Sequence, residues 1–86
     1  MQVSAQVSIY PLGPVKIGPV VEAVWSTLES FGLALVRGTM STIVEGTSQD
    51  VFAALRKAFD VVADEGATVM VLTISNACPR QAPPKE

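Results

Sequence analysis

The sequence contains no histidine and only one cysteine, Cys78, and these absences exclude several kinds of active site. A chain without histidine has no Ser-His-Asp or Cys-His nucleophile, no histidine acid–base catalysis and none of the usual zinc sites. A single cysteine cannot form an internal disulfide, and without a neighbouring base it is more often inert than nucleophilic. We therefore expect neither a metal site nor nucleophilic catalysis.

Charged residues are also few, at 16% of the chain against about 25% in a typical soluble domain. The formal net charge is −2 and the basic residues are scattered, whereas binding to a phosphate backbone requires clustered positive charge. No apolar run reaches the roughly 18 to 20 residues of a membrane span, and the first 15 residues do not resemble a signal peptide. We predict a cytoplasmic protein with no nucleic-acid or membrane partner.

The length of 86 residues fits a single domain, which we place at residues 1–79. Residues 80–86 are rich in proline and have no periodicity, so we predict a disordered tail. Hydrophobic residues make up 49% of the chain. Because a domain this small buries only roughly 60 to 65% of its unfolded surface, this composition indicates that part of the surface is hidden in an oligomer.

The first half of the chain predicts a strand, a helix and two more strands. Residues 2–10 alternate as in an extended chain and end at Pro11, which has no backbone donor. A helix is expected to begin with Gly18 as its cap and Pro19 in its first turn, and to end at Gly32. Its apolar positions recur at helical spacing: Val20, Val21, Val24, Leu28 and Phe31. Strands are expected at residues 33–36 and 41–45.

The second half predicts a helix and a final strand. Thr47, with Asp50 three residues later, resembles a capping arrangement, and Gly66 ends the helix. The apolar stripe of this helix is expected to be Val51, Phe52, Leu55, Phe59 and Val62. We expect its two phenylalanines, like Trp25 of the first helix, to lie in the core. The last strand, residues 68–75, is apolar on both faces.

The predicted order βαββαβ is that of an α+β, ferredoxin-like fold. Its four-stranded antiparallel sheet has the order 4-1-3-2, with both helices on one face and the other face bare. Alternation in the first strand directs Ser4, Gln6 and Ser8, with Tyr10, to the bare face. A face exposed to water usually carries charge, but these residues are polar and uncharged. We predict that Ser4, Gln6 and Ser8 form the interface of a homodimer or homotetramer.

The topology brings the end of the first strand and the start of the third to one edge of the molecule. Ile9 and Tyr10 are then neighbours of Ser41 and Thr42, with Met70 nearby. If Glu45 faces water, Thr42 points towards the helices. Its hydroxyl then needs a partner, because an unmade buried hydrogen bond costs about 1 to 3 kcal/mol. That partner is either local backbone, the more common case, or a ligand.

The carboxylates offer no catalytic pair, because the periodicity places them on helix surfaces in contact with solvent. They are Glu22, Glu29, Asp50, Asp60, Asp64 and Glu65.

Four segments, SIYP, MSTIVEG, DVFAALRKAF and SNACP, resemble in this order the YkoF-like family of thiamine- and hydroxymethylpyrimidine-binding proteins. The resemblance covers about residues 4–79. It implies a ferredoxin-like binder of thiamine or its hydroxymethylpyrimidine precursor, without a cofactor or established catalysis, that serves vitamin B1 uptake or salvage. It also implies that main-chain groups at Ile9 and the hydroxyl of Thr42 hold the aminopyrimidine. The remaining expected site residues are Ser41, Tyr10, Ser8 and Met70.

Two other functions compete with ligand binding. One is a module that oligomerises through its sheet and has no physiological ligand. The other is a small enzyme of the dimeric ferredoxin-like type, which the lack of histidine and of a carboxylate pair disfavours.

Overall fold

The chain folds into four strands and two helices in the predicted βαββαβ order. A computed structural model describes residues 1–14, 16–38 and 41–77. Its elements are β1 (Gln2–Pro11), α1 (Ile17–Ser30), β2 (Ala34–Arg37), β3 (Thr42–Thr47), α2 (Ser48–Ala63) and β4 (Thr68–Ser75). The sheet has the order β2-β3-β1-β4 with antiparallel neighbours, which confirms the predicted fold. Cys78 and the predicted tail lie outside the described residues.

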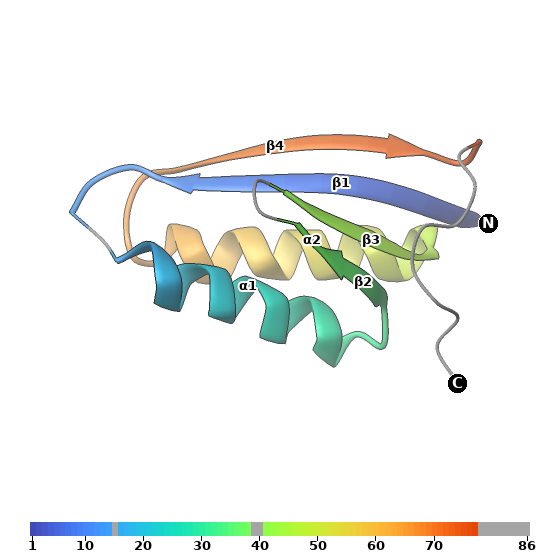
Figure 1. Ribbon diagram of the computed structural model, residues 1–86, viewed down its shortest axis with the longest axis horizontal. Coiled ribbons are helices and arrows are strands. Elements are labelled where there is room, and N and C mark those ends of the chain that lie inside the picture. Colours follow the sequence, from blue (N-terminus) through green and yellow to red (C-terminus); the bar gives the residue numbers. More distant parts are fainter. Residues whose placement is uncertain (15, 39–40, 78–86) are drawn as a thin grey trace.

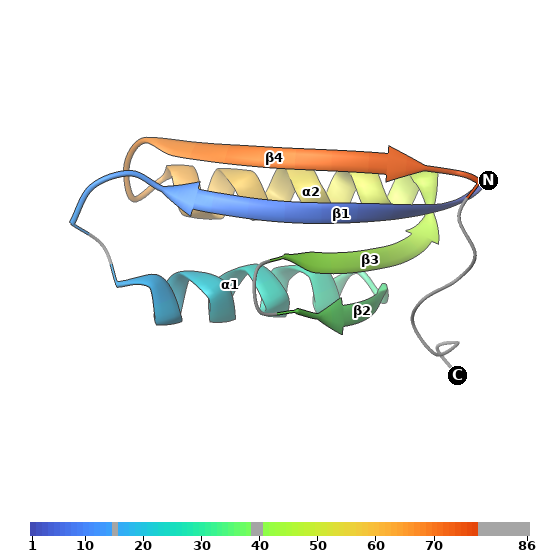
Figure 2. The ribbon, with the colours of Figure 1, turned by 45° about the horizontal axis from the view of Figure 1, so that its top comes forward.

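Both helices cover one face of the sheet, and the core lies between these two layers (Figures 1 and 2). Val3, Ala5 and Val7 are buried on this face, as the alternation in β1 predicts. Across from them, β3 contributes Val44, which pairs with Ala5. The buried apolar cluster comprises Val3, Ala5, Val7, Val24, Leu28, Leu33, Val44, Val51, Ala54, Leu55, Ala58 and Val62.

The helix ends agree with the sequence at three positions and differ at one. Thr47 caps α2, because its side chain accepts a hydrogen bond from the backbone N–H of Asp50 at 3.2 Å. Gly32 follows α1 with a φ of 75°, the left-handed conformation that favours glycine. Pro19 lies in the first turn of α1 as expected, but the helix begins at Ile17, before Gly18, with Lys16 at the cap position. Lys16 makes no side-chain cap bond. Lysine is not one of the residues favoured at this position, so the sequence gives no signal for a helix start there.

The predicted apolar stripe of α2 was wrong at Phe52, whose side chain is 53% exposed. Buried alanines, Ala54 and Ala58, take the place of phenylalanine against the sheet. The core positions Val51, Leu55 and Val62 recur at helical spacing, and Phe52 lies about 100° around the helix from Val51. Phe59 is half-buried rather than part of the core cluster.

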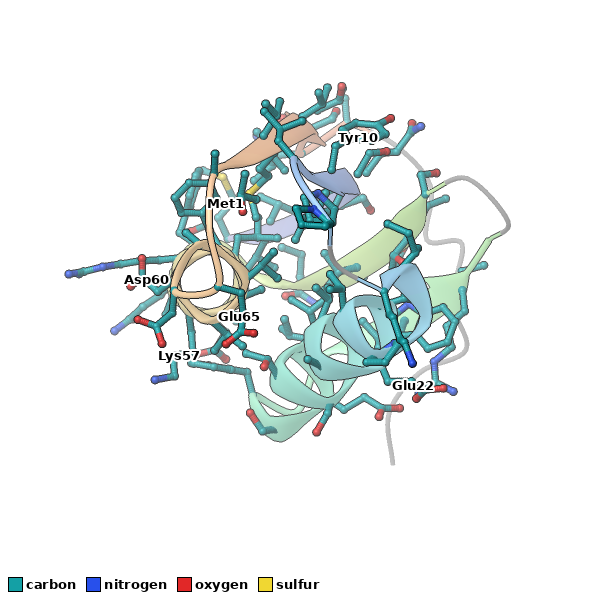
Figure 3. All side chains as sticks on the ribbon, turned by 90° about the vertical axis from the view of Figure 1, so that its left-hand side faces the viewer. Met1, Tyr10, Glu22, Lys57, Asp60 and Glu65 are labelled. Atoms are coloured by element: carbon teal, nitrogen blue, oxygen red, sulfur yellow. The ribbon has the colours of Figure 1, made fainter. Side chains whose placement is uncertain are left out.

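The second face of the sheet has no helix over it, and it carries little charge. Tyr10 and the apolar side chains of Val69 and Val71 are exposed there, beside Gln6 and Ser8. Most of the exposed charges lie instead on or next to the helices, and Figure 3 shows Glu22, Lys57, Asp60 and, just after α2, Glu65. All six carboxylates expected on helix surfaces are exposed.

Glu45 differs from the expectation that it faces water, since it is only 3% exposed. It lies in β3 between Ala34 of β2 and Ser4 of β1, and the Ser4 hydroxyl donates to its carboxylate at 3.1 Å. The orientation of Thr42 that was inferred from Glu45 is still correct. Side chains alternate along β3, and Thr42 and Val44 are buried on the helix side of the sheet.

Within the described residues, no helix is long and apolar enough to cross a membrane. The cytoplasmic location stays a prediction.

Candidate ligand-binding site

The two strands that flank β1 pair with it over different lengths among the described residues. Its pairing with β4 extends to Pro11, opposite Thr68. Its described pairing with β3 runs to Val7, opposite Thr42. Figure 2 shows β1 and β4 extending beyond the ends of β2 and β3. The end of β1 therefore projects past the start of β3.

Beside this end of β1 lies a pocket of about 390 Å³, the size of a small-molecule site. The end of β1 forms one wall and the first half of α1 forms another, while Gly38, Ser41 and Thr42 line a third side. None of the described lining residues carries a charge, and most are apolar. They are Val7, Ser8, Ile9, Tyr10, Pro11, Ile17, Val20, Val21, Val24, Trp25, Gly38, Ser41 and Thr42.

The structure brings together most of the residues expected at the site. Five line the pocket: Ser8, Ile9, Tyr10, Ser41 and Thr42. Met70 does not line it, but lies opposite Ile9 on β4 and packs against the core. Ser41 also lies within 3.4 Å of the Gln6 amide nitrogen, so the pocket rim adjoins the open sheet face.

Thr42 has a partner that sequence reasoning did not anticipate. Its side chain is 8% exposed, and its hydroxyl accepts a hydrogen bond from the indole Nε1–H of Trp25 at 2.9 Å. The expected alternatives were local backbone or a ligand. Because an indole can only donate, Thr42 must be the acceptor in this bond, and its hydroxyl keeps its own hydrogen as a donor.

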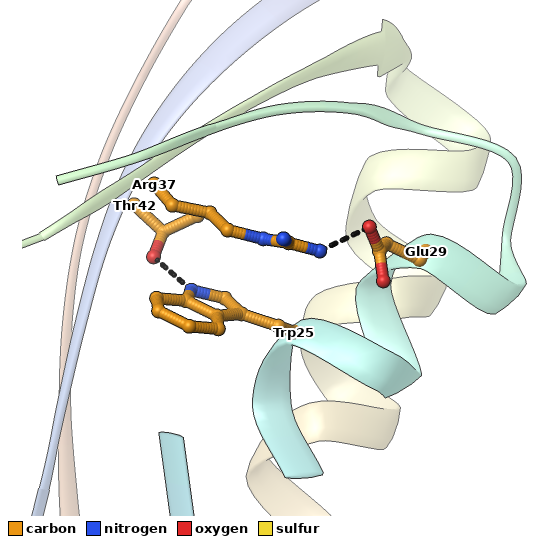
Figure 4. A network of polar contacts seen from close by, with 4 residues as sticks. All are labelled: Trp25, Glu29, Arg37 and Thr42. Atoms are coloured by element: carbon orange, nitrogen blue, oxygen red, sulfur yellow. Dashed lines mark hydrogen bonds and ion pairs between the residues drawn. The ribbon is translucent and has the colours of Figure 1, made fainter. Parts of the chain in front are cut away.

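Trp25 lines the pocket instead of lying in the core as expected. The Arg37 guanidinium lies over its ring (Figure 4) at 4.9 Å from the centroid, within the range of a cation–π contact. Arg37 is also ion-paired with Glu29, one turn after Trp25 on α1. The sequence could have suggested that Arg37 and Thr42 lie together only through the register of the sheet, which places them directly opposite each other.

We expect Glu29→Gln to lower the free energy of unfolding by less than about 1 kcal/mol. The Arg37 and Glu29 side chains are 45% and 48% exposed, and ion pairs in contact with water contribute little. Urea unfolding at low salt should show this loss, and high salt should shrink it. The matched control is Glu22→Gln, an exposed glutamate of the same helix. A loss that high salt leaves unchanged would contradict an electrostatic role for the pair.

The sequence matches the thiamine-binding protein family over residues 5–77. A hypothetical protein from Methanocaldococcus jannascii (MJ1052) is similar in structure, with a TM-score of 0.83 and 24% identity over 95% of this chain and 87% of its own. Protein SP2199 from Streptococcus pneumoniae has a TM-score of 0.79 and 21% identity over 87% and 86% of the two chains. A Thermotoga maritima protein, whose name proposes a role in thiamine biosynthesis or salvage, has a TM-score of 0.76 and 17% identity over 86% and 82%.

Among proteins with curated descriptions, none matches the sequence. At these identities the similar structures establish the fold alone. The family match is independent of them, and it runs from residue 5, within β1, to beyond the end of β4, which includes every described residue that lines the pocket. The chain belongs to the thiamine-binding protein family.

Proposed function

We propose that the protein binds thiamine or hydroxymethylpyrimidine in this pocket, without catalysis, in vitamin B1 uptake or salvage. The observation that carries the proposal is the position of the pocket, at the end of β1 beside Thr42, in a chain of the thiamine-binding family. The name of the Thermotoga maritima protein agrees with a role in salvage.

The lining has the chemistry that an aminopyrimidine requires. Its ring is flat, with nitrogen atoms that accept hydrogen bonds and an exocyclic amine that donates them. Val20, Val21 and Trp25 offer apolar surface for the ring. The Thr42 hydroxyl offers a donor, and strand backbone near Ile9 offers carbonyl acceptors.

The absence of a catalytic step is part of the proposal. The polar side chains among the described lining residues are hydroxyls and one indole. General acid–base catalysis mostly uses histidine, carboxylate or lysine side chains, and none of these is among the described lining residues, where Tyr10 is the one ionisable group. Neutral donors and acceptors fix the orientation of a bound molecule instead.

Titration with thiamine and with hydroxymethylpyrimidine tests the proposal. Trp25 is the only tryptophan and lies in the pocket wall, so its fluorescence reports binding at this site. We expect a saturable change, matched by calorimetric heat, with a Kd below the millimolar range for at least one ligand. Pyridoxine, another flat vitamin of similar size, is the control. If neither ligand binds below millimolar concentration, the proposed function fails.

A second role, oligomerisation through the open sheet face, is favoured by the apolar side chains exposed there. Val71 lies near the middle of the edge strand β4, beside Ser8 of β1, and is 53% exposed. An unpaired face with exposed valines and little charge is typical of a surface that another chain covers. The predicted interface residues Ser4, Gln6 and Ser8 lie on the same face.

We expect Val71→Lys to reduce the molecular mass measured by light scattering to that of a smaller assembly. A lysine there must lose its hydration when a second subunit covers it. Phe52→Lys is a matched control, because Phe52 is also 53% exposed but lies on α2. An unchanged mass for Val71→Lys, or an equal change for the control, would remove the sheet face from the interface.

A further inference from the structure

Arg37 lies outside the pocket, but it contacts a side chain that lines it. The Arg37 guanidinium lies 4.9 Å from the centroid of the Trp25 ring and is ion-paired with Glu29, one turn further along α1 (Figure 4). Trp25 is among the described lining residues, whereas Arg37 and Glu29 are not. The guanidinium therefore covers a part of the ring that does not border the pocket.

The indole is held at two places by a pair of residues from β2 and β3. Arg37 and Thr42 lie opposite each other in the register of these strands. Arg37 contacts the face of the ring, and the Thr42 hydroxyl accepts a hydrogen bond from its Nε1–H at 2.9 Å. Because both contacts come from the sheet, they fix the position of the ring relative to the strands as well as to its own helix.

We propose that Arg37 is a positioning residue that holds the Trp25 ring in the wall of the pocket and so keeps the pocket open for a ligand. Glu29 supports this role by holding the guanidinium. The inference rests on the proposed function and adds to it a residue that acts on ligand affinity without touching the ligand.

The physical reason is that an apolar pocket can be filled by a side chain from its own wall. Trp25 is only half-buried, and the pocket beside it measures about 390 Å³ and has a mostly apolar lining among the described residues. Rotation of the indole into this space would bury apolar surface, which is favourable. A ligand then binds only the molecules with an open pocket, and its apparent affinity falls with their fraction. Arg37 opposes this rotation, because it would break the cation–π contact.

Arg37→Ala tests the inference, with hydroxymethylpyrimidine as the probe. This ligand is neutral at mildly alkaline pH, so its binding does not respond directly to the loss of a positive charge. A cation–π contact at a half-exposed site corresponds to a factor of roughly 3 to 10 in an equilibrium constant. We expect calorimetry to show a Kd raised by this factor.

Arg56→Ala is the matched control, because it removes the same charge from an exposed position of α2 that is not among the described lining residues. We expect its Kd to equal that of the wild-type protein. An unchanged Kd for Arg37→Ala, or an equal rise for Arg56→Ala, would overturn the inference.

Thiamine separates positioning from a direct effect of charge. Its thiazolium is a cation, so the loss of a nearby guanidinium removes a repulsion and favours its binding. Positioning predicts that hydroxymethylpyrimidine loses more affinity for Arg37→Ala than thiamine does. A purely direct effect predicts unchanged binding of hydroxymethylpyrimidine and tighter binding of thiamine, and that result would overturn the inference. If the wild-type protein binds thiamine alone, its neutral analogue 3-deazathiamine replaces hydroxymethylpyrimidine as the probe.

Time-resolved fluorescence anisotropy measures the motion of the ring itself, because Trp25 is the only tryptophan. We expect a larger amplitude of nanosecond motion in ligand-free Arg37→Ala than in the wild-type protein. Arg37→Lys keeps the cation but not the planar guanidinium, so it should lie between the two in both anisotropy and Kd. An indole that is equally rigid in Arg37→Ala and in the wild-type protein would overturn the inference.

The outcomes distinguish this inference from the proposed function. If the wild-type protein binds none of these ligands, the proposed function fails and the inference fails with it. If it binds a ligand and Arg37→Ala binds the neutral probe equally well, only the inference fails.

Discussion

Leu28→Ala is expected to lower the free energy of unfolding by about 2 to 5 kcal/mol. The Leu28 side chain is 0% exposed and belongs to the cluster in which α1 and α2 pack on the sheet. Truncation removes buried methyl groups and leaves a cavity. Because a domain of this size has only a small net stability, such a loss is a large part of the total. Urea unfolding followed by circular dichroism measures it.

Leu12→Ala is the matched control for this prediction. Leu12 is 55% exposed and lies just beyond β1, so its truncation removes little buried area. We expect a change of less than about 0.5 kcal/mol. Similar losses for the two variants would contradict the assignment of Leu28 to the core.

Thr42→Val is expected to weaken thiamine binding by about 1 to 3 kcal/mol, or roughly 5- to 150-fold. Valine has nearly the same shape as threonine but no hydroxyl, so the pocket keeps its volume and loses one donor. Trp25 also loses its acceptor, but its indole is only half-buried and water can replace the contact. We therefore expect an unfolding free energy only about 1 kcal/mol lower, much less than the loss for Leu28→Ala.

The control for this variant is Thr27→Val on the same helix as Trp25. The Thr27 hydroxyl donates to the carbonyl of Ala23 at 2.8 Å, and Thr27 is not among the residues that line the pocket. Its loss should leave thiamine affinity unchanged within a factor of two or so. Equal binding by Thr42→Val and the wild-type protein would remove Thr42 from the site.

Features that depend on local period were predictable from the sequence. The two-residue alternation of β1 determined which side chains meet the helices, and Val3, Ala5 and Val7 are buried accordingly. The Thr47 cap of α2 was predictable because its partner, Asp50, is three residues away. Topology then placed the end of β1 next to Thr42, and the pocket lies at that junction.

Features that depend on the distance between layers were not predictable. Helical period alone does not show that α2 approaches the sheet through Ala54 and Ala58, which leaves Phe52 outside. The contact of Trp25 with Thr42 requires the relative position of α1 and the β2–β3 hairpin, a tertiary property. Burial of Glu45 was missed for a similar reason, because its partner Ser4 is distant in sequence.

A crystal structure of the protein with thiamine tests the central claim most directly. The account predicts that the aminopyrimidine lies in the pocket between the end of β1 and Trp25, with a ring nitrogen within hydrogen-bond distance of the Thr42 hydroxyl. Thiamine bound on the open sheet face, or in the pocket with its pyrimidine turned away from Thr42, would contradict it.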